Sequence, residues 1–322
     1  MATGSRYSCY YVKEQKSNIT PASAKFIPFR VTKSGLDINI KTLESEELRD
    51  DAETADFRLG ARHVEGAVTG EMSFGTFDEL IAAALRSSWQ DNVVKGGIER
   101  HSFTFVDFNA DIPEGKYTIY RGCEVNSMAF SLSAENMTTV EFGIVGRSME
   151  IADTLPVGST VLERTTTSPM DGFQGRLLEG GQEISVITEI GLTVENGIEP
   201  RFVVGSKFSI DPSSGRRAVN GTANVYFIDN TLRNKYLDET ETSITFDLID
   251  PANPNQKYTV EIPRVKFTEA PRPIDGEGDI MLNMGYKGLL DPTVGSSIKI
   301  TRVVEASGAA ALAKLNQLEG TK

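Results

Sequence analysis

Residues 60–74, GARHVEGAVTGEMSF, alternate between apolar and polar side chains over their whole length. One face of the segment carries Val64, Val68, Met72 and Phe74, and the other carries Glu65, Thr69, Glu71 and Ser73. A period of two residues is typical of a β-strand with one buried and one solvated face. The segment therefore predicts a strand at the border of a hydrophobic core.

The same segment occurs a second time in the chain. Residues 215–227, GRRAVNGTANVYF, repeat it 155 positions later, with identical pairs at Gly60/Gly215, Arg62/Arg217, Val64/Val219 and Gly66/Gly221. Further blocks match in the same order: 42–44 with 193–195, 76–81 with 231–236, 102–105 with 243–246, and 117–119 with 258–260. Five ordered blocks indicate an internal duplication, which has to be recognised before a fold is assigned.

The length of 322 residues agrees with about two domains of ordinary size. We expect an N-terminal arm at 1–25, a first domain at 26–150, a linker at 151–180, a second domain at 181–304 and a flexible C-terminal tail at 305–322. The first 25 residues fit a docking arm and a frayed terminus equally well.

Each half is expected to contain several strands and one helix, so the fold class is mainly β. In the first half, Thr76 with Glu79 three residues later makes a capping-box pattern ahead of apolar residues at helical spacing. In the second half, Asn230 precedes a shorter helical segment, 231–240. Alternation predicts further strands, among them 26–39, 125–133 and 138–145.

Composition argues against a protein that grips nucleic acid. The chain has 45 acidic side chains against 33 Lys and Arg, a net charge of −12, whereas tight binding to phosphates requires basic groups. Such a surface could still let nucleic acid pass without sticking. Cys9 and Cys123 stand in no CxxC pattern and fit free buried thiols. Without a signal-peptide or membrane-length apolar run, we expect folding in a cytoplasm.

A search for catalytic chemistry finds no constellation. The two histidines, His63 and His101, belong to no HExxH motif, and GxSxG and Walker-type patterns are missing. Residues 275–279, DGEGD, resemble a calcium loop but favour a hairpin turn, because the ligand spacing of an EF-hand is missing. We expect no enzymatic activity, no cofactor and no metal site.

The polar faces of the predicted strands are distinctive. Outside the first predicted strand (26–39), and apart from Arg264 and Lys266, they carry short neutral or acidic side chains. The candidates are Glu65, Thr69, Glu71, Thr139, Glu141, Thr193, Asn220, Thr222, Asn224 and Asp279. Such a face would line an aqueous channel while repelling phosphate. Two long polar loops, 44–59 and 196–214, stand at matched places in the two halves and suggest a shared role.

The sequence resembles the major tail tube proteins of long non-contractile-tailed bacteriophages. In the first half the resemblance rests on FIPFRVTKSGLDINIKTLESEELRDD (26–51), GARHVEGAVTGEMSFGTFDELIAAAL (60–85) and YRGCEVNSMAFSLSAENMTTVEFGIVG (120–146). In the second half it rests on VENGIEPRFVVGS (194–206), GRRAVNGTANVYFIDNTLRNKYLDETE (215–241) and GEGDIMLNMGY (276–286). These segments span most of residues 26–304 in family order.

The resemblance implies two tandem β-sandwich domains, each with one flanking α-helix, in a structural protein of the virion tail. Rings of such domains stack into a hollow tube that holds the tape-measure protein and double-stranded DNA without binding them tightly. The polar face would be the lumen wall. Tail-terminator and tail-tip proteins would be further partners, and no membrane is implied.

The duplication adds an expectation about the ring. Because three chains would supply six domains, we expect a homotrimeric ring with pseudo-sixfold symmetry, with a hexamer as the alternative. The two long loops would reach the neighbouring ring. Their candidate contact residues are Glu44, Glu46, Glu47, Arg49, Asp50, Asp51, Arg201, Phe202 and Lys207.

Other classes of function stay open on the sequence alone. One is a tube or terminator subunit of a contractile injection system. Another is an adhesin-like or carbohydrate-binding β-sandwich, which predicts a cluster of exposed aromatic residues, whereas Trp89 is expected on the helix side. A third is a glycosidase with paired carboxylates, although no spacing singles out a pair.

Overall fold

The structure, a computed structural model, describes residues 3–172, 177–184, 186–274 and 276–304. After a short 3₁₀ helix (Gly4–Arg6), the first half contains β1 (Tyr7–Lys13), β2 (Lys25–Phe29), β3 (Val31–Ser34), β4 (Asp37–Glu44), β5 (Phe57–Glu71), α1 (Asp78–Ala84), β6 (Val93–Lys95), β7 (Phe103–Asn109), β8 (Tyr117–Ser133), β9 (Thr139–Gly146) and β10 (Ser148–Ala152). The fold is mainly β, as predicted.

The rest of the chain is also mainly β. It contains β11 (Thr160–Val161), β12 (Leu177–Glu179), β13 (Gln182–Glu183), β14 (Ile187–Glu195), β15 (Glu199–Arg201), β16 (Ile210–Ser213), β17 (Ala218–Tyr226), α2 (Thr231–Leu237), β18 (Thr242–Asp250), β19 (Asn253–Glu269), β20 (Met281–Gly288) and β21 (Lys299–Val303). The two described helices are short, so strand pairing and sheet packing organise the molecule.

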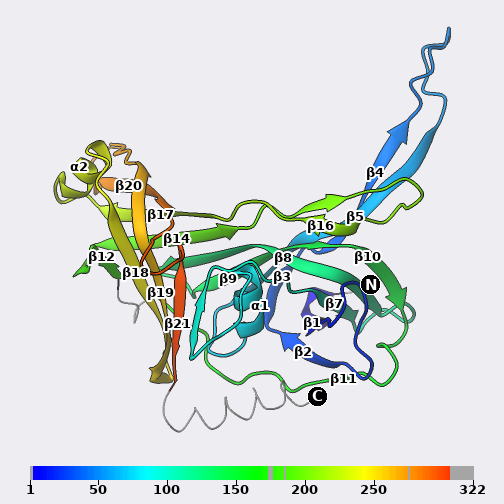
Figure 1. Ribbon diagram of the computed structural model, residues 1–322, viewed down its shortest axis with the longest axis horizontal. Coiled ribbons are helices and arrows are strands. Elements are labelled where there is room, and N and C mark those ends of the chain that lie inside the picture. Colours follow the sequence, from blue (N-terminus) through cyan, green and yellow to red (C-terminus); the bar gives the residue numbers. More distant parts are fainter. Residues whose placement is uncertain (1–2, 173–176, 185, 275, 305–322) are drawn as a thin grey trace.

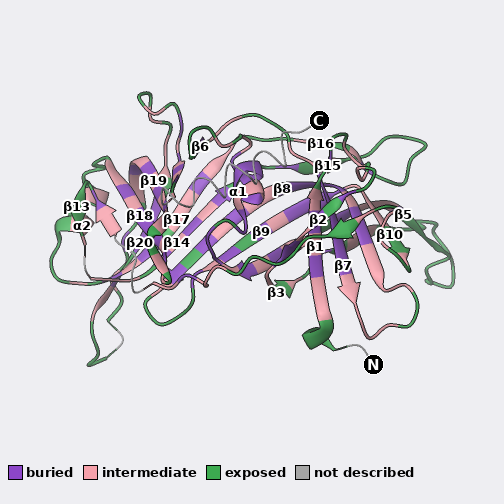
Figure 2. Ribbon diagram, turned by 90° about the horizontal axis from the view of Figure 1, so that it is seen from below, coloured by how far each residue is buried: buried purple, intermediate pink, exposed green. Residues whose placement is uncertain are grey.

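One continuous sheet runs through both halves in the order β4, β5, β9, β8, β14, β17, β20, β19 (Figure 1). The halves join where β8 pairs antiparallel with β14, from Ser127 opposite Glu195 to Ser133 opposite Glu189. Figure 2 shows the buried residues of these strands alternating with more exposed ones. The sheet therefore has one face in the core and one solvated face.

A second layer completes a sandwich-like arrangement. The long strand β8 passes between layers: its first part pairs with β7 and β10, and its second part pairs with β9 and β14. β19 likewise pairs with β18 and β21 and then with β20. Predicted inward residues of the central sheet, such as Val68, Met128 and Phe142, are 0% exposed. The apolar side chains that alternation places on one face thus form the core between the layers.

Apart from β6, which lies between α1 and β7 and pairs with β21, the two halves have the same strand connectivity. In each half a central strand (β5 or β17) is followed by a helix, a second-layer strand (β7 or β18), a 17-residue strand (β8 or β19), a central strand (β9 or β20) and a last second-layer strand (β10 or β21). The pairings also correspond, with β5–β9 matched by β17–β20 and β7–β8 by β18–β19.

Close backbone approach explains one identical pair of the repeat. A Cβ atom added to Gly66 would lie 2.2 Å from the carbonyl oxygen of Gly35, and one added to Gly221 would lie 2.4 Å from that of Gly191. Only glycine allows a neighbouring strand to come so near. Strand register also corrects one sequence match, because Thr193 corresponds to Asp37 and not to Thr42.

Both predicted helices are present, but their ends differ from the capping prediction. Thr76 does not cap α1; its hydroxyl hydrogen-bonds with those of Ser73 and Thr165, and Phe77 occupies the N-cap position without a side-chain bond. α2 follows Asn230 as predicted, although the carboxylate of Asp229 accepts the Thr231 N–H. The Thr76 capping box is therefore wrong, because local hydroxyl contacts occupy the side chain.

The segments expected at the borders of the domains carry structure of their own. Within residues 1–25, β1 pairs with both β2 and β7 and buries Cys9 and Tyr11. The expected linker 151–180 includes β11, which runs parallel to β2, and β12. The expected tail, 305–322, lies outside the described residues. The domain boundaries themselves stay a prediction.

Candidate functional site: a polar sheet face and two long loops

All of the predicted channel-lining residues except Asp279 lie on one face of the central sheet. A row runs across neighbouring strands, with Thr69 opposite Glu141, Glu141 opposite Ala129, Ala129 opposite Thr193 and Thr193 opposite Asn220. Residues directly opposite each other in a ladder point to the same side. Thr69 Oγ1 also donates to Glu141 Oε2 at 3.0 Å. The strands of both halves therefore contribute to one surface.

Neighbouring rows contain the other candidates. Glu71 stands opposite Thr139, and Thr222 stands opposite Gly191. Asn224 Nδ2 donates to Glu189 Oε2 at 3.0 Å, and Glu65 is exposed on β5. Asp279 is exposed in the segment before β20, outside the sheet. We call the solvated face formed by these strands the polar face.

The polar face also includes residues outside the candidate set. They share the strand parity of the candidates and are Asp37, Ser127, Ser131, Ser133, Glu189, Glu195, Glu269 and Asn283. Lysines occur near its two ends, where Lys33 stands opposite Thr69 and Lys266 opposite Lys287. Alternation places Ser127, Ser131, Ser133 and Asn283 on the outward side, and extending it along β4, β14 and β19 would have added Asp37, Glu189, Glu195 and Glu269. The middle of the face thus carries carboxylates and small neutral groups.

The first long loop projects from the body of the molecule. Residues 45–56 connect β4 to β5 at the tip of an extended hairpin (Figure 1). The candidates Glu44, Glu46, Glu47, Arg49, Asp50 and Asp51 are all exposed there. Arg49 pairs with Asp51 at 2.5 Å, and this hydrogen bond lowers the pKa of the Asp51 carboxyl. The hairpin is available for contacts outside the chain.

The second long loop folds back onto the first half. The backbone N–H of Arg62 donates to the Lys207 carbonyl at 2.8 Å, and the rings of Phe202 and His63 lie 6.0 Å apart. Arg201 donates from its guanidinium to the Asp211 carbonyl. Although the loops occupy matched places in the sequence, their conformations differ. Only the first one reaches away from the molecule.

The described residues offer little that resembles a reaction centre. Among them, no group of three or more His, Cys, Asp or Glu side chains is placed to hold a metal ion. His63 contacts Glu65 at 3.1 Å, and burial lowers the pKa of His101. Neither helix of the described chain is long and apolar enough to span a membrane. The polar face and the hairpin are the features that distinguish this surface.

Comparison with known proteins identifies the family of the chain. A family model described as phage tail tube protein matches residues 4–288. The comparison with curated proteins gives no match. Since the family match extends over both halves, from the 3₁₀ helix before β1 to the end of β20, the chain belongs to the phage tail tube protein family.

Proposed function

We propose that this tail tube protein forms rings that stack into a hollow conduit, through which the tape-measure protein and then genomic DNA pass into the host. The observation that carries the proposal is the single sheet through both halves, with one core face and one polar face. Chains would assemble in the host cytoplasm and remain in the virion tail. Tail-terminator and tail-tip proteins would close the two ends of the tube.

The polar face suits the lumen of such a tube. Glu71, Glu141 and Glu189 carry negative charge there, and their neighbours in the rows are mostly Ser, Thr, Asn, Ala and Gly. Carboxylates repel the phosphates of DNA at short range, and small neutral side chains offer few groups that could bind DNA. DNA inside the tube would therefore slide past the wall without forming stable contacts.

The repeated connectivity favours a ring of three chains. Each chain supplies two units with matching strand pairings, and the β8–β14 contact joins them side by side. Three chains would place six such units around one axis and close the sheet into a barrel, which leaves no exposed strand edge. The projecting β4–β5 hairpin would contact the adjacent ring.

Electron microscopy and native mass spectrometry test this assembly. Negative-stain images of the purified chain should show long hollow tubes, and native mass spectra should show trimers as the smallest closed ring. A ring of six chains would replace the trimer while leaving the tube intact. A stable monomer under all assembly conditions would overturn the proposal.

A charge reversal tests the lumen. Glu141→Lys should leave tubes intact and reduce the infectivity of phage assembled from the variant, because lysines would hold DNA phosphates. Glu163→Lys makes the same charge change at an exposed residue in the connection between β11 and β12. If both variants gave wild-type infectivity, the polar face would not be the DNA-facing wall.

A further inference from the structure

The junction between the two halves shows how one unit joins the next. At its ends, the Asn196 N–H donates to the Asn126 carbonyl at 2.8 Å, and the Ala134 N–H donates to the Thr188 carbonyl at 3.0 Å. Because backbone polar groups alternate in direction along a strand, the even-numbered residues of β8 between these bonds face β14. Ser127 and Glu195 are then a directly opposed pair without mutual hydrogen bonds.

The edges equivalent to β8 and β14 are unpaired at the two ends of the sheet. Ser127 corresponds to Glu269 of β19, since each follows a register irregularity and stands opposite a matched glycine, Gly143 or Gly285. Glu195 corresponds to Asn39 of β4 by the register with β5 and β17. Within the described residues, no strand pairs with the outer edge of β4 or of residues 268–274.

Two prolines in residues 268–274 agree with the correspondence between this segment and the second part of β8. Pro271 and Pro273 correspond to Ala129 and Ser131, whose backbone groups do not face the β8–β14 junction. The Pro271 carbonyl indeed accepts the Asn283 N–H at 3.1 Å, on the side of β20. Proline lacks an N–H and is tolerated where the ladder needs no donor. Both prolines thus leave the outer edge able to pair.

The side chains around the two helices show the same correspondence between the halves. Arg217 of the second half donates to the carbonyls of Leu85 and Gly97, at 2.8 and 2.7 Å, at the carboxyl end of α1. Its counterpart in the repeat, Arg62, has a buried Nε without a hydrogen-bond partner in the described chain. α2 offers an uncovered flank, with Leu237 64% exposed. A first half from another chain would bring Arg62 toward this flank.

We infer that a second copy of the chain pairs its β4 edge with residues 268–274 in the register of the β8–β14 junction, with Glu269 opposite Asn39 and Ala270 opposite Ile38. The inference rests on the proposed ring and adds its register. The contact between chains repeats the contact within the chain, and Arg62 takes the place at α2 that Arg217 occupies at α1.

A disulfide designed across the proposed contact between β4 and residues 268–274, here called the seam, tests its register. Asn39→Cys/Glu269→Cys places two cysteines at a directly opposed pair without mutual hydrogen bonds, where Cα atoms lie about 4.5 Å apart, within the range for a disulfide. Oxidised tubes run on a non-reducing gel should give covalent dimers and then trimers. Cys9 and Cys123 are buried, so few disulfides should form through these natural cysteines. The matched control, Asp37→Cys/Glu269→Cys, shifts the pair by two residues to about 7–8 Å and should not link.

The outcomes separate the register from the proposed function. Tubes that link through the Asn39 variant and not through the Asp37 control support the seam. Tubes that link through neither pair, or only through the control, overturn the register while the tube proposal stands. If the unmodified chain forms no tubes, the proposed function itself fails. Mixing the two single-cysteine chains should give dimers alone, which identifies the bond as one between copies.

Discussion

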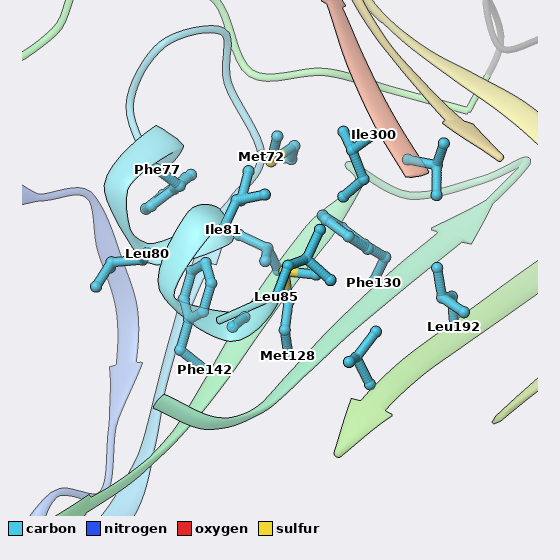
Figure 3. Close-up of a cluster of buried hydrophobic side chains, with 14 of the residues drawn as sticks. Met72, Phe77, Leu80, Ile81, Leu85, Met128, Phe130, Phe142, Leu192 and Ile300 are labelled. Carbon is cyan, nitrogen blue, oxygen red and sulfur yellow. The ribbon is translucent and has the colours of Figure 1, made fainter. Parts of the chain in front are cut away.

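The two helices occupy equivalent places in the repeat, yet one is buried and the other is not. Leu80 and Ile81 of α1 are 0% exposed, whereas no residue of α2 is buried. The difference comes from what lies beside each helix. Figure 3 shows Leu192 of β14 and Ile300 of β21, both from the second half, around the core beneath α1. The second half covers α1, whereas α2, the equivalent element, has no such cover within the described chain.

The contacts at α1 also show how the halves hold each other. Asp78 accepts a hydrogen bond from the Tyr258 hydroxyl and pairs with Arg302 at 2.5 Å. The Arg302 guanidinium lies 4.7 Å from the centre of the Trp89 ring. These groups come from α1, the segment after it, β19 and β21. The covered unit is therefore tied to its neighbour by a polar cluster as well as by apolar packing.

The largest expected effect contrasts one residue from each helical region. Phe77→Ala should lower the free energy of unfolding by about 3–5 kcal/mol, because it removes a fully buried ring from the core. Leu237→Ala in α2 should change it by about 0.5 kcal/mol or less in the unassembled chain, since the side chain is largely exposed. Urea unfolding followed by circular dichroism measures both. Equal losses of unfolding free energy in the two variants would contradict the difference in burial between the two helical regions.

A smaller effect is expected at the cluster between the halves. Arg302→Ala should destabilise the chain by about 3 kcal/mol, because Asp78 would keep a mostly buried carboxylate without its cation. Lys299→Ala removes a more exposed partner, paired with Glu261 at 2.5 Å, and should change stability by about 1 kcal/mol or less. Thermal unfolding of the two variants in parallel gives the comparison. A loss of stability in Lys299→Ala as large as that in Arg302→Ala would contradict the expected difference between the two ion pairs.

The sequence predicted what depends on local pattern. Strict alternation identified Val64 and Val68 as core and Thr69 as polar face, because a strand fixes side-chain direction with a period of two. It failed at Asp279, which lies just before β20, because element ends are set by pairing partners. The same alternation in Tyr7, Cys9 and Tyr11 could have identified β1, which was read as an arm or a terminus.

Long-range pairing accounts for what the sequence did not predict. Nothing in the pattern of β8 indicates that its second part leaves β7 and pairs with β14, since a register between distant strands depends on the assembled sheet. The second loop gave no signal that it lies on Arg62. The duplication indicated equivalent elements, but it could not show that α1 is covered and α2 is uncovered.

Two buried aspartates in equivalent second-layer strands extend the comparison to charge. Asp107 of β7 is 8% exposed and accepts hydrogen bonds from the hydroxyls of Tyr7 and Tyr120. Burial raises the pKa of Asp107 from 3.8 to about 6. Asp247 of β18 instead pairs with the Lys257 ammonium at 2.9 Å. The two buried carboxylates thus differ, because among the described residues Asp247 has a cationic partner and Asp107 has none.

The smallest expected effect follows from this difference and depends on pH. Because the pKa of Asp107 is higher in the folded than in the unfolded chain, the folded state holds the proton more tightly, and stability falls as pH rises from about 4 through 6. The shift corresponds to about 2–3 kcal/mol. Asp107→Asn should flatten that slope, whereas Asp247→Asn should leave it in place. Chemical unfolding between pH 4 and 7 measures the slopes, and an unchanged slope in Asp107→Asn would show that the Tyr7 and Tyr120 hydroxyls stabilise the carboxylate enough to offset its burial.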